Sequence, residues 1–298
     1  MTSEIVQATY PLLTGYIFAF MLYGFLCSQV WSYYETFPKD LTRIKVLVFY
    51  LMAVVTAQTA MNAHEVLITF GTHFSEVDAL QKINLQWFAC PIITVLAGFP
   101  VQMFYAYRMT RFSRSNCASK ITKVIVVIVV VLALFASITS IIGGVKVYQG
   151  QFEQSIFNEA VKFQEMWLVS SAVCDILITA TMIFLLRTSF STGFPKTEST
   201  STGVQKTERM VSRIIRQLIE AGFITAAFSV ADLCVFLSFP SHTYHVAICN
   251  SFPELYSVTL LIILNGRSHD SGSNSNTKVE LPWDVVRGSG SESELEFR

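Results

Sequence analysis

Apolar residues gather in seven long stretches along the chain, and polar connections separate each stretch from the next. A helix needs roughly 20 mostly apolar residues to cross the hydrocarbon core of a bilayer, and each stretch is of that order. The predicted spans one to seven are Leu12–Tyr34, Val46–Thr69, Trp87–Tyr107, Val124–Gly143, Met166–Leu186, Gln217–Phe239 and Val246–Asn265. The pattern predicts an all-α integral membrane protein built as a bundle of seven transmembrane helices.

Polar residues interrupt four of these spans at helical spacing. Residues three or four positions apart share one face of an α-helix, and a face exposed to lipid would not carry them. We therefore expect four polar stripes that point into the bundle. They are Gln58, Asn62 and Glu65 in span two; Ser171, Asp175 and Thr179 in span five; Thr225, Ser229 and Asp232 in span six; and Asn250, Glu254, Ser257 and Asn265 in span seven.

Asp175 raises the question of what balances a carboxylate near the middle of a span. A charged side chain there costs roughly 2.5 to 3.5 kcal/mol on insertion scales, and no Lys or Arg falls inside any of the seven spans. We therefore expect the partner of Asp175 to be a hydroxyl, an amide or water rather than a base.

The four stripes favour a polar cavity that opens to the outside and binds a small polar or cationic ligand, because polar residues within the membrane tend to mark functional paths. The alternative is a dry set of interhelical hydrogen bonds that only fixes packing. The candidate ligand-binding residues are Asn62, Glu65, Asp175, Asp232 and Glu254.

Composition and charge add an orientation. Of the 298 residues, 52% are hydrophobic and 14% are charged, against about 25% charged in soluble domains. The amino terminus and the even-numbered loops hold 3 Lys and Arg residues, whereas the odd-numbered loops and the carboxyl-terminal segment hold 18. Because basic residues near span ends favour the cytosolic side, we expect the amino terminus outside and the carboxyl terminus in the cytosol. Residues 1–267 are predicted to form the transmembrane domain, and residues 268–298, rich in Ser and Gly, a disordered cytosolic tail.

Two of the six cysteines, Cys90 and Cys249, should lie near the outer ends of their spans, where a disulfide is allowed. Buried thiols are also common apolar fillers, so the sequence leaves this pairing open.

Histidines raise a weaker hypothesis of metal chemistry. His64, His242 and His245 should lie on or near the outer face, and with Asp232 they offer the donor types of a zinc-dependent membrane hydrolase. No spacing fixes their geometry. External pH sensing is favoured over a metal site, since histidine titrates near physiological pH, and ordinary exposed histidines are favoured over both. We expect neither a metal nor a cofactor.

Two known classes of seven-helix protein can be compared by motif. A microbial rhodopsin needs a Schiff-base lysine in span seven, and "YHVAICNSFPELYSVTLLIILNGR" has none. A class A receptor carries Asp/Glu-Arg-Tyr after span three and Asn-Pro-x-x-Tyr in span seven, and neither motif stands there. Receptor classes that lack both motifs stay open.

Four segments carry a resemblance to a known family: "PVQMFYAYRMTRFSRS", "CDILITATMIFLLR", "LIEAGFITAAFSVADLCVFL" and the span-seven segment above. They resemble the large seven-helix membrane protein family of basidiomycete fungi that is catalogued only as a domain of unknown function. The resemblance covers all seven spans and is most diagnostic over residues 172–267. It implies no activity, and it implies signature positions at Gln102, Arg108, Asp175, Glu220, Gly222 and in the closing Leu-Asn-x-Arg pattern at residues 264–267.

Several of these residues should gather at the cytosolic end of the bundle. We hypothesise a cytosolic lock in which Glu220 pairs with Arg108 or Arg267 and Gln102 bonds Asn265. In the alternative, the two arginines only extend toward water and Glu220 only begins a helix.

The sequence favours a non-enzymatic, multi-pass protein of receptor-like architecture, in the plasma membrane or an endomembrane. A cation- or proton-coupled transporter or channel is the competing interpretation, and a zinc-dependent hydrolase is the third. The lipid bilayer is the expected partner, with a cytosolic protein on the basic face left open. No basic patch interleaved with aromatic residues suggests nucleic acid.

Overall fold

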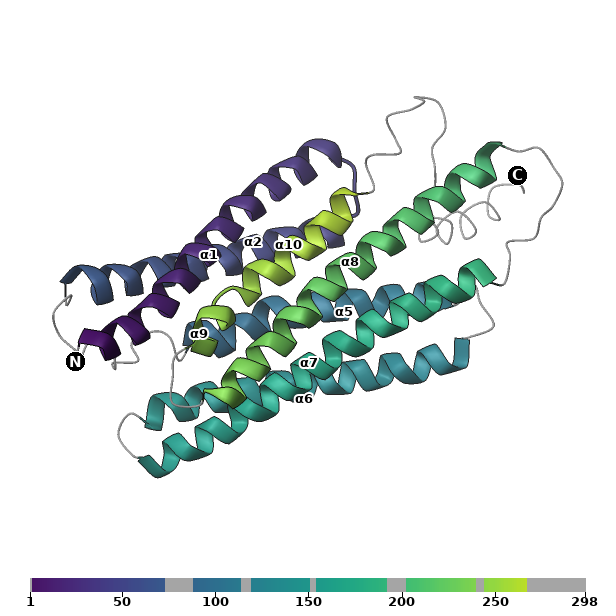
Figure 1. Ribbon diagram of the computed structural model, residues 1–298. Coiled ribbons are helices and arrows are strands. Elements are labelled where there is room, and N and C mark those ends of the chain that lie inside the picture. Colours follow the sequence, from purple (N-terminus) through teal and green to yellow (C-terminus); the bar gives the residue numbers. More distant parts are fainter. Residues whose placement is uncertain are drawn as a thin grey trace, which may run out of the picture.

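Helices account for the apolar stretches of the sequence (Figure 1). The computed structural model describes residues 2–72, 88–113, 119–150, 154–191, 202–239 and 244–266. The α-helices are α1 (Thr2–Thr36), α2 (Thr42–Val66), α5 (Thr94–Ser113), α6 (Ser119–Gly150), α7 (Gln154–Ser191), α8 (Thr202–Ser238), α9 (Tyr244–Cys249) and α10 (Phe252–Asn265). Two π-helical turns, Leu67–Thr72 and Ala89–Ile93, follow α2 and precede α5.

Seven helical stretches within the described residues are long and apolar enough to cross a membrane. They are Thr9–Thr36, Thr42–Gly71, Cys90–Arg111, Lys120–Gly150, Ser155–Leu185, Ile219–Ser238 and Tyr244–Asn265. Each overlaps the span predicted at its place, so the all-α bundle of seven membrane-capable helices is confirmed. The predicted tail, residues 268–298, lies outside the described residues.

The exposed face of α6 is apolar, as is its buried face. Val124, Val127 and Val131 are between 58% and 61% exposed, whereas Val129 and Ala133 of the same helix are buried. A helix that is apolar on both its buried and its exposed faces is typical of a membrane span rather than of a water-soluble domain.

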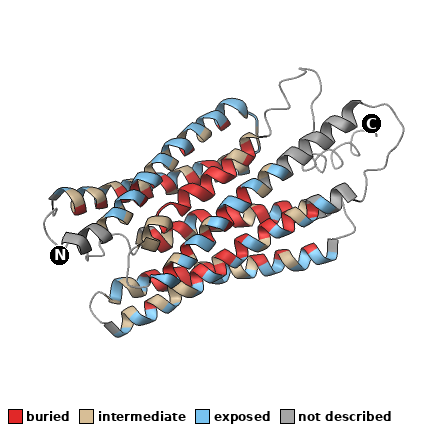
Figure 2. Cartoon of the chain, viewed as in Figure 1, coloured by how far each residue is buried: buried red, intermediate tan, exposed pale blue. Residues whose placement is uncertain are grey.

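Helix α10 is the central helix of the bundle. It contacts α1, α2, α5 and α8, and every residue from Phe252 to Leu264 except Ile262 is buried, so that Figure 2 shows it almost entirely red. Because neighbours cover it on every side, its polar residues have only protein, or groups bound between the helices, as partners.

Pro100 interrupts the hydrogen bonding of α5 and creates a contact with α2. Proline has no N–H, so the carbonyl four residues earlier, that of Leu96, loses its helical donor. Tyr50 of α2 donates its hydroxyl to this carbonyl at 3.1 Å. The interruption therefore ties the two helices together.

Span seven is divided into α9 and α10 by a turn at Asn250 and Ser251. Pro253 follows directly, and because it has no N–H it cannot donate to the carbonyl of Cys249. Cys249 is joined to Cys90 by a disulfide with a Cα–Cα distance of 5.9 Å, which answers the question that the sequence left open. We call this end of the bundle the disulfide end.

A glycine allows α1 to lie directly against α9 at the disulfide end. A Cβ atom added to Gly15 would stand 2.5 Å from the Cα atom and 2.7 Å from the carbonyl oxygen of Ala247. Backbone atoms cannot turn aside as a side chain can, so this contact requires glycine. Gly24 of the same helix has nothing within 4 Å of the equivalent position.

Gly15→Ala should therefore lower the thermal unfolding temperature of the purified protein by several degrees, because α1 or α9 must move away. Gly24→Ala is the matched control, and it should leave that temperature unchanged or raise it slightly, since alanine favours a helix. Equal effects of the two substitutions would show that α1 does not pack against α9 in this way.

Candidate functional site

Asp175 of α7 is the acceptor at the centre of a four-helix hydrogen-bond network. Ser229 of α8 and Tyr256 of α10 donate their hydroxyls to Oδ2 at 2.7 Å and 2.6 Å. Gln102 of α5 donates its amide to Oδ1 at 3.1 Å. Asp175 is only 3% exposed, and its three partners are buried as well. We call these four residues the Asp175 network.

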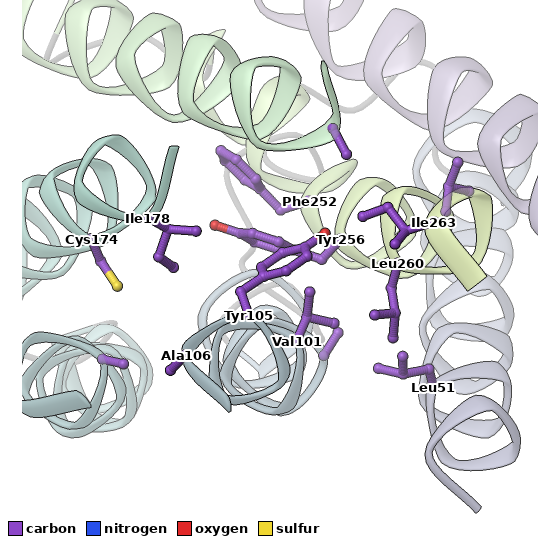
Figure 3. Packing of buried hydrophobic residues seen from close by; sticks show 14 of the residues in the cluster. Leu51, Val101, Tyr105, Ala106, Cys174, Ile178, Phe252, Tyr256, Leu260 and Ile263 are labelled. Carbon is purple, nitrogen blue, oxygen red and sulfur yellow. The ribbon is translucent and has the colours of Figure 1, made fainter. Parts of the chain in front are cut away.

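The network confirms the expectation that Asp175 is balanced by hydroxyls and an amide rather than by a base. Its local geometry follows from close packing of α5 on α10. A Cβ added to Gly98 would lie 3.2 Å from the ring of Tyr256, so glycine makes room for that ring. Figure 3 shows Tyr256 and Tyr105 in the middle of the core, with Ile178 of α7 nearby.

A small cavity adjoins the network. It is lined by Ser229, Tyr256 and Ser171 together with Thr94, Trp167, Leu168 and Phe252, and its volume is about 10 Å³. That is about the smallest volume that holds one water molecule. In this arrangement the surroundings of Asp175 are closed, and a larger ligand would need the helices to separate.

The four polar stripes face the interior, as the sequence predicts. Every stripe residue in spans two and six is buried, as are Asp175, Thr179, Asn250, Glu254 and Ser257. Some of these residues bond within their own helix rather than to a neighbouring helix. Thr179 donates its hydroxyl to the carbonyl of Asp175, and Thr225 donates its hydroxyl to that of Gly222. Other stripe residues, from spans two and seven, belong to a second cluster at the break of span seven.

We call this second group the break cluster; it consists of Gln58, Asn250, Ser251, Glu254 and Ser257. Gln58 of α2 donates its amide to the backbone carbonyl of Asn250 at 2.9 Å. All five residues are 0% exposed. Within the described part of the chain, the Oε1 atom of Gln58, both Glu254 carboxylate oxygens, and the side-chain polar atoms of Asn250, Ser251 and Ser257 have no hydrogen-bond partner.

Leaving a buried polar atom without a partner costs about 1 to 3 kcal/mol. Several such atoms in one place indicate a bound water, ion or other ligand. The break cluster is therefore a candidate site for such a ligand, whereas the Asp175 carboxylate is satisfied within the protein.

The remaining predicted ligand-binding residues are buried but are not part of the Asp175 network. Asn62 stands one turn beyond Gln58 on α2, and its amide nitrogen has no partner within the described residues. Glu65 is 4% exposed. Asp232 of α8 is 0% exposed, and neither carboxylate oxygen has a partner among the described residues. The structure thus buries the five predicted residues and places Asp175 and Glu254 in different clusters.

One contact of the predicted cytosolic lock, the bond between Gln102 and Asn265, is wrong. Gln102 donates to Asp175, and the Asn265 amide donates to Gln29 of α1, to its backbone and side-chain oxygens at 2.9 Å and 2.8 Å. Glu220 accepts from Arg216 at 2.9 Å, one turn away on α8.

The physical reasons are depth and direction. Gln102 lies at the same level of the bundle as Asp175 of α7 and bonds to its carboxylate. Glu220 points away from the bundle, and its side chain is 58% exposed. Arg108 is buried with its guanidinium 5.3 Å from the centre of the Phe104 ring. Arg267 lies outside the described residues.

The structure gives a reason for glycine at position 222, one of the signature positions of the resemblance. A Cβ there would stand 2.7 Å from the Thr179 hydroxyl oxygen, so glycine lets α8 approach α7. Gly266 has a similar role, because a Cβ would meet the side chain of Gln217.

The histidine hypothesis stays a prediction, because the structure does not describe all of its residues. His245 packs edge-on against Phe236, with 4.9 Å between ring centres, and His242 lies outside the described residues. No group of three or more His, Cys, Asp and Glu side chains placed to hold a metal occurs in the described ranges.

Sequence reasoning missed Tyr256. Tyr256 was not included in the four polar stripes, because a tyrosine in an apolar span is usually interpreted as a packing residue. A buried tyrosine hydroxyl normally has a hydrogen-bond partner, and this rule was the available signal for a buried acceptor beside Tyr256.

Comparison with known proteins gives one match. Residues 171–269, which contain Asp175, Ser229, the break of span seven and α10, match the profile of a family of unknown function (DUF6534). No curated protein and no solved structure matches the chain. The matched family carries no activity that could be compared with the site.

Asp175→Leu should lower the free energy of unfolding by about 2 kcal/mol or more, because three buried donors lose their acceptor. Asp175→Asn should lower it less, since its amide oxygen still accepts from Ser229 and Tyr256. The measurement is reversible unfolding of the protein in bilayers or mixed micelles.

The control for this series is Glu220→Gln, which removes an exposed ion pair with little effect on stability. If Asp175→Leu proved as stable as the wild type, the carboxylate would not join the four helices.

Proposed function

We propose that the chain is a non-enzymatic, receptor-like seven-helix membrane protein with a ligand site at the disulfide end. The observation that carries the proposal is the Asp175 network, in which one carboxylate joins α5, α7, α8 and α10 at once. A junction of this kind can take a small number of alternative arrangements, which is what a switching bundle requires. We further assign the chain to the fungal seven-helix family that it resembles.

The proposal places the disulfide end outside and the carboxyl terminus in the cytosol. Two independent features support this orientation. The 18 basic residues in the odd-numbered loops and the carboxyl-terminal segment, against 3 on the other side, follow the positive-inside rule. The Cys90–Cys249 disulfide needs an oxidising compartment, which lies on the non-cytosolic side.

The ligand site is the break cluster together with Asn62 of the neighbouring turn. Among the described residues, no basic side chain donates to its unpartnered oxygens, so the expected ligand is small and polar or cationic. A ligand that draws α10 toward α2 would strain the Tyr256–Asp175 bond on the other side of α10. The signal would then reach the cytosolic ends of α7 and α8, which continue to Ser191 and begin at Thr202.

A cation- or proton-coupled transporter is the second candidate, and a specific observation favours it. Span seven is discontinuous, and a buried carboxylate, Glu254, lies in the first turn after the break. Broken helices near buried charged groups are typical of ion-coupled transporters. The two candidates differ in whether an ion crosses the membrane.

Spin labels on Ile121 of α6 and Phe223 of α8, both exposed, test the receptor proposal in a background without other exposed thiols. Asp175→Asn should loosen the network and shift the distance distribution between the labels by about 2 Å or more. Glu220→Gln should leave the distribution unchanged. An unchanged distribution in Asp175→Asn would overturn the proposal.

Reconstituted vesicles separate the two candidates. We expect the wild type to give no proton or sodium flux above that of protein-free vesicles under an imposed gradient. A flux that disappears in Asp175→Asn or Glu254→Gln would replace the receptor with the transporter.

A further inference from the structure

We propose that the break cluster is a binding site for one monovalent cation of the size of sodium. The cation would lie between α2 and the turn that divides span seven. This inference rests on the proposed function for its opening to the outside and deepens it by naming the class of ligand. Four lines of observation support it, from the atoms, the backbone, the charge and the contact with α2.

The unpartnered atoms of the cluster are mainly oxygens. They are Oε1 of Gln58, Oδ1 of Asn250, Oγ of Ser251, Oγ of Ser257 and both carboxylate oxygens of Glu254. Hard cations take oxygen ligands from carboxylates, amides, carbonyls and water. The one nitrogen in the set is Nδ2 of Asn250, and the oxygen of the same side-chain amide, Oδ1, is also in the set.

These residues lie in the first turns of α10, in the turn before it and on the neighbouring helix α2. Glu254 and Ser257 of α10 are three residues apart, which places their side chains on one helical face, and Asn250 belongs to the turn just before this helix. Ser251 stands three residues before Glu254 and so belongs to the adjacent turn. Gln58 reaches the same place from α2, as its bond of 2.9 Å to the Asn250 carbonyl shows.

The backbone adds acceptors that a continuous helix would not have. Pro253 cannot donate to the carbonyl of Cys249, and the carbonyl of Asn250 accepts from a side chain. Unwound carbonyls at a break within the membrane are the groups that coordinate sodium in discontinuous helices. The positive end of the 14-residue helix α10 favours a carboxylate in its first turn, where Glu254 stands.

The charge of the cluster selects a monovalent ion. Glu254 is its only carboxylate, and none of the seven predicted spans contains a Lys or Arg. One monovalent cation neutralises one carboxylate, whereas a divalent ion would leave an uncompensated positive charge in a medium where that is costly. The described residues also gather no set of three His, Cys, Asp or Glu side chains, and the cluster itself lacks the imidazole and thiolate donors that transition metals take.

Thermal unfolding of the purified full-length protein tests the site without any assumption about orientation. Sodium chloride is exchanged for choline chloride at constant ionic strength. An ion that binds only the folded protein raises the unfolding temperature as the concentration of the ion increases. We expect a rise of about 3 °C or more at saturating sodium. Potassium should give a smaller rise than sodium.

Glu254→Gln, which keeps the shape of the side chain, should abolish the dependence on sodium, and Ser257→Ala should shift it to higher concentration. The matched control is Glu220→Gln, an exposed carboxylate on α8, which should keep the wild-type response. Line broadening of the ²³Na resonance by the wild-type protein, reversed by excess lithium, gives a direct measurement if a variant fails to fold.

A wild-type unfolding temperature that does not distinguish sodium from choline would overturn the site and would indicate that the cluster holds water only. A full sodium response in Glu254→Gln would overturn it as well. Either result leaves the label distances of Asp175→Asn unaffected, so failure of the cation site and failure of the receptor proposal can be told apart.

Discussion

The architecture depends on how one carboxylate is satisfied in an environment without water. An ionised or neutral carboxyl group in the middle of a bundle needs partners, and none of the predicted spans offers a base. Asp175 takes its partners from α5, α8 and α10, each of which contributes a single side chain. Two of the bonds end on the same oxygen, so α8 and α10 meet α7 at one atom. Glycines at positions 98 and 222 provide the close approach that these bonds require.

Helix α10 connects this satisfied centre to an unsatisfied one. Tyr256 and Glu254 are two residues apart, which places them about 200° apart around the helix. One side of α10 is thus bonded to α7, while the other side carries the break cluster and faces Gln58 of α2. A rigid helix packed on all sides can shift only as a unit. A ligand that moves α10 at the break would therefore act on the Asp175 network, which is the physical link that the proposed receptor function requires.

Periodicity and charge predicted the spans, the inward direction of the polar stripes and the chemical type of the partners of Asp175. These features follow from local rules, since the cost of a polar group in lipid acts on each helix separately. Pairings between helices could not be predicted in the same way. Gln102 was expected near Asn265 and instead meets Asp175, because helix depth and rotation depend on packing that no single span encodes. Tyr256 was missed for the same reason, since only the neighbouring helix makes its hydroxyl a donor to a carboxylate.

The central claim is that Ser229 and Tyr256 share one acceptor, Oδ2 of Asp175. A double-mutant cycle with Ser229→Ala and Tyr256→Phe, measured as the free energy of unfolding in a bilayer, tests this claim most directly. Residues in one hydrogen-bond network show interaction energies of about 0.5 to 3 kcal/mol. The account predicts a value in that range, because loss of one donor changes the bond that the other donor makes. Additivity of the two substitutions within about 0.3 kcal/mol would contradict it.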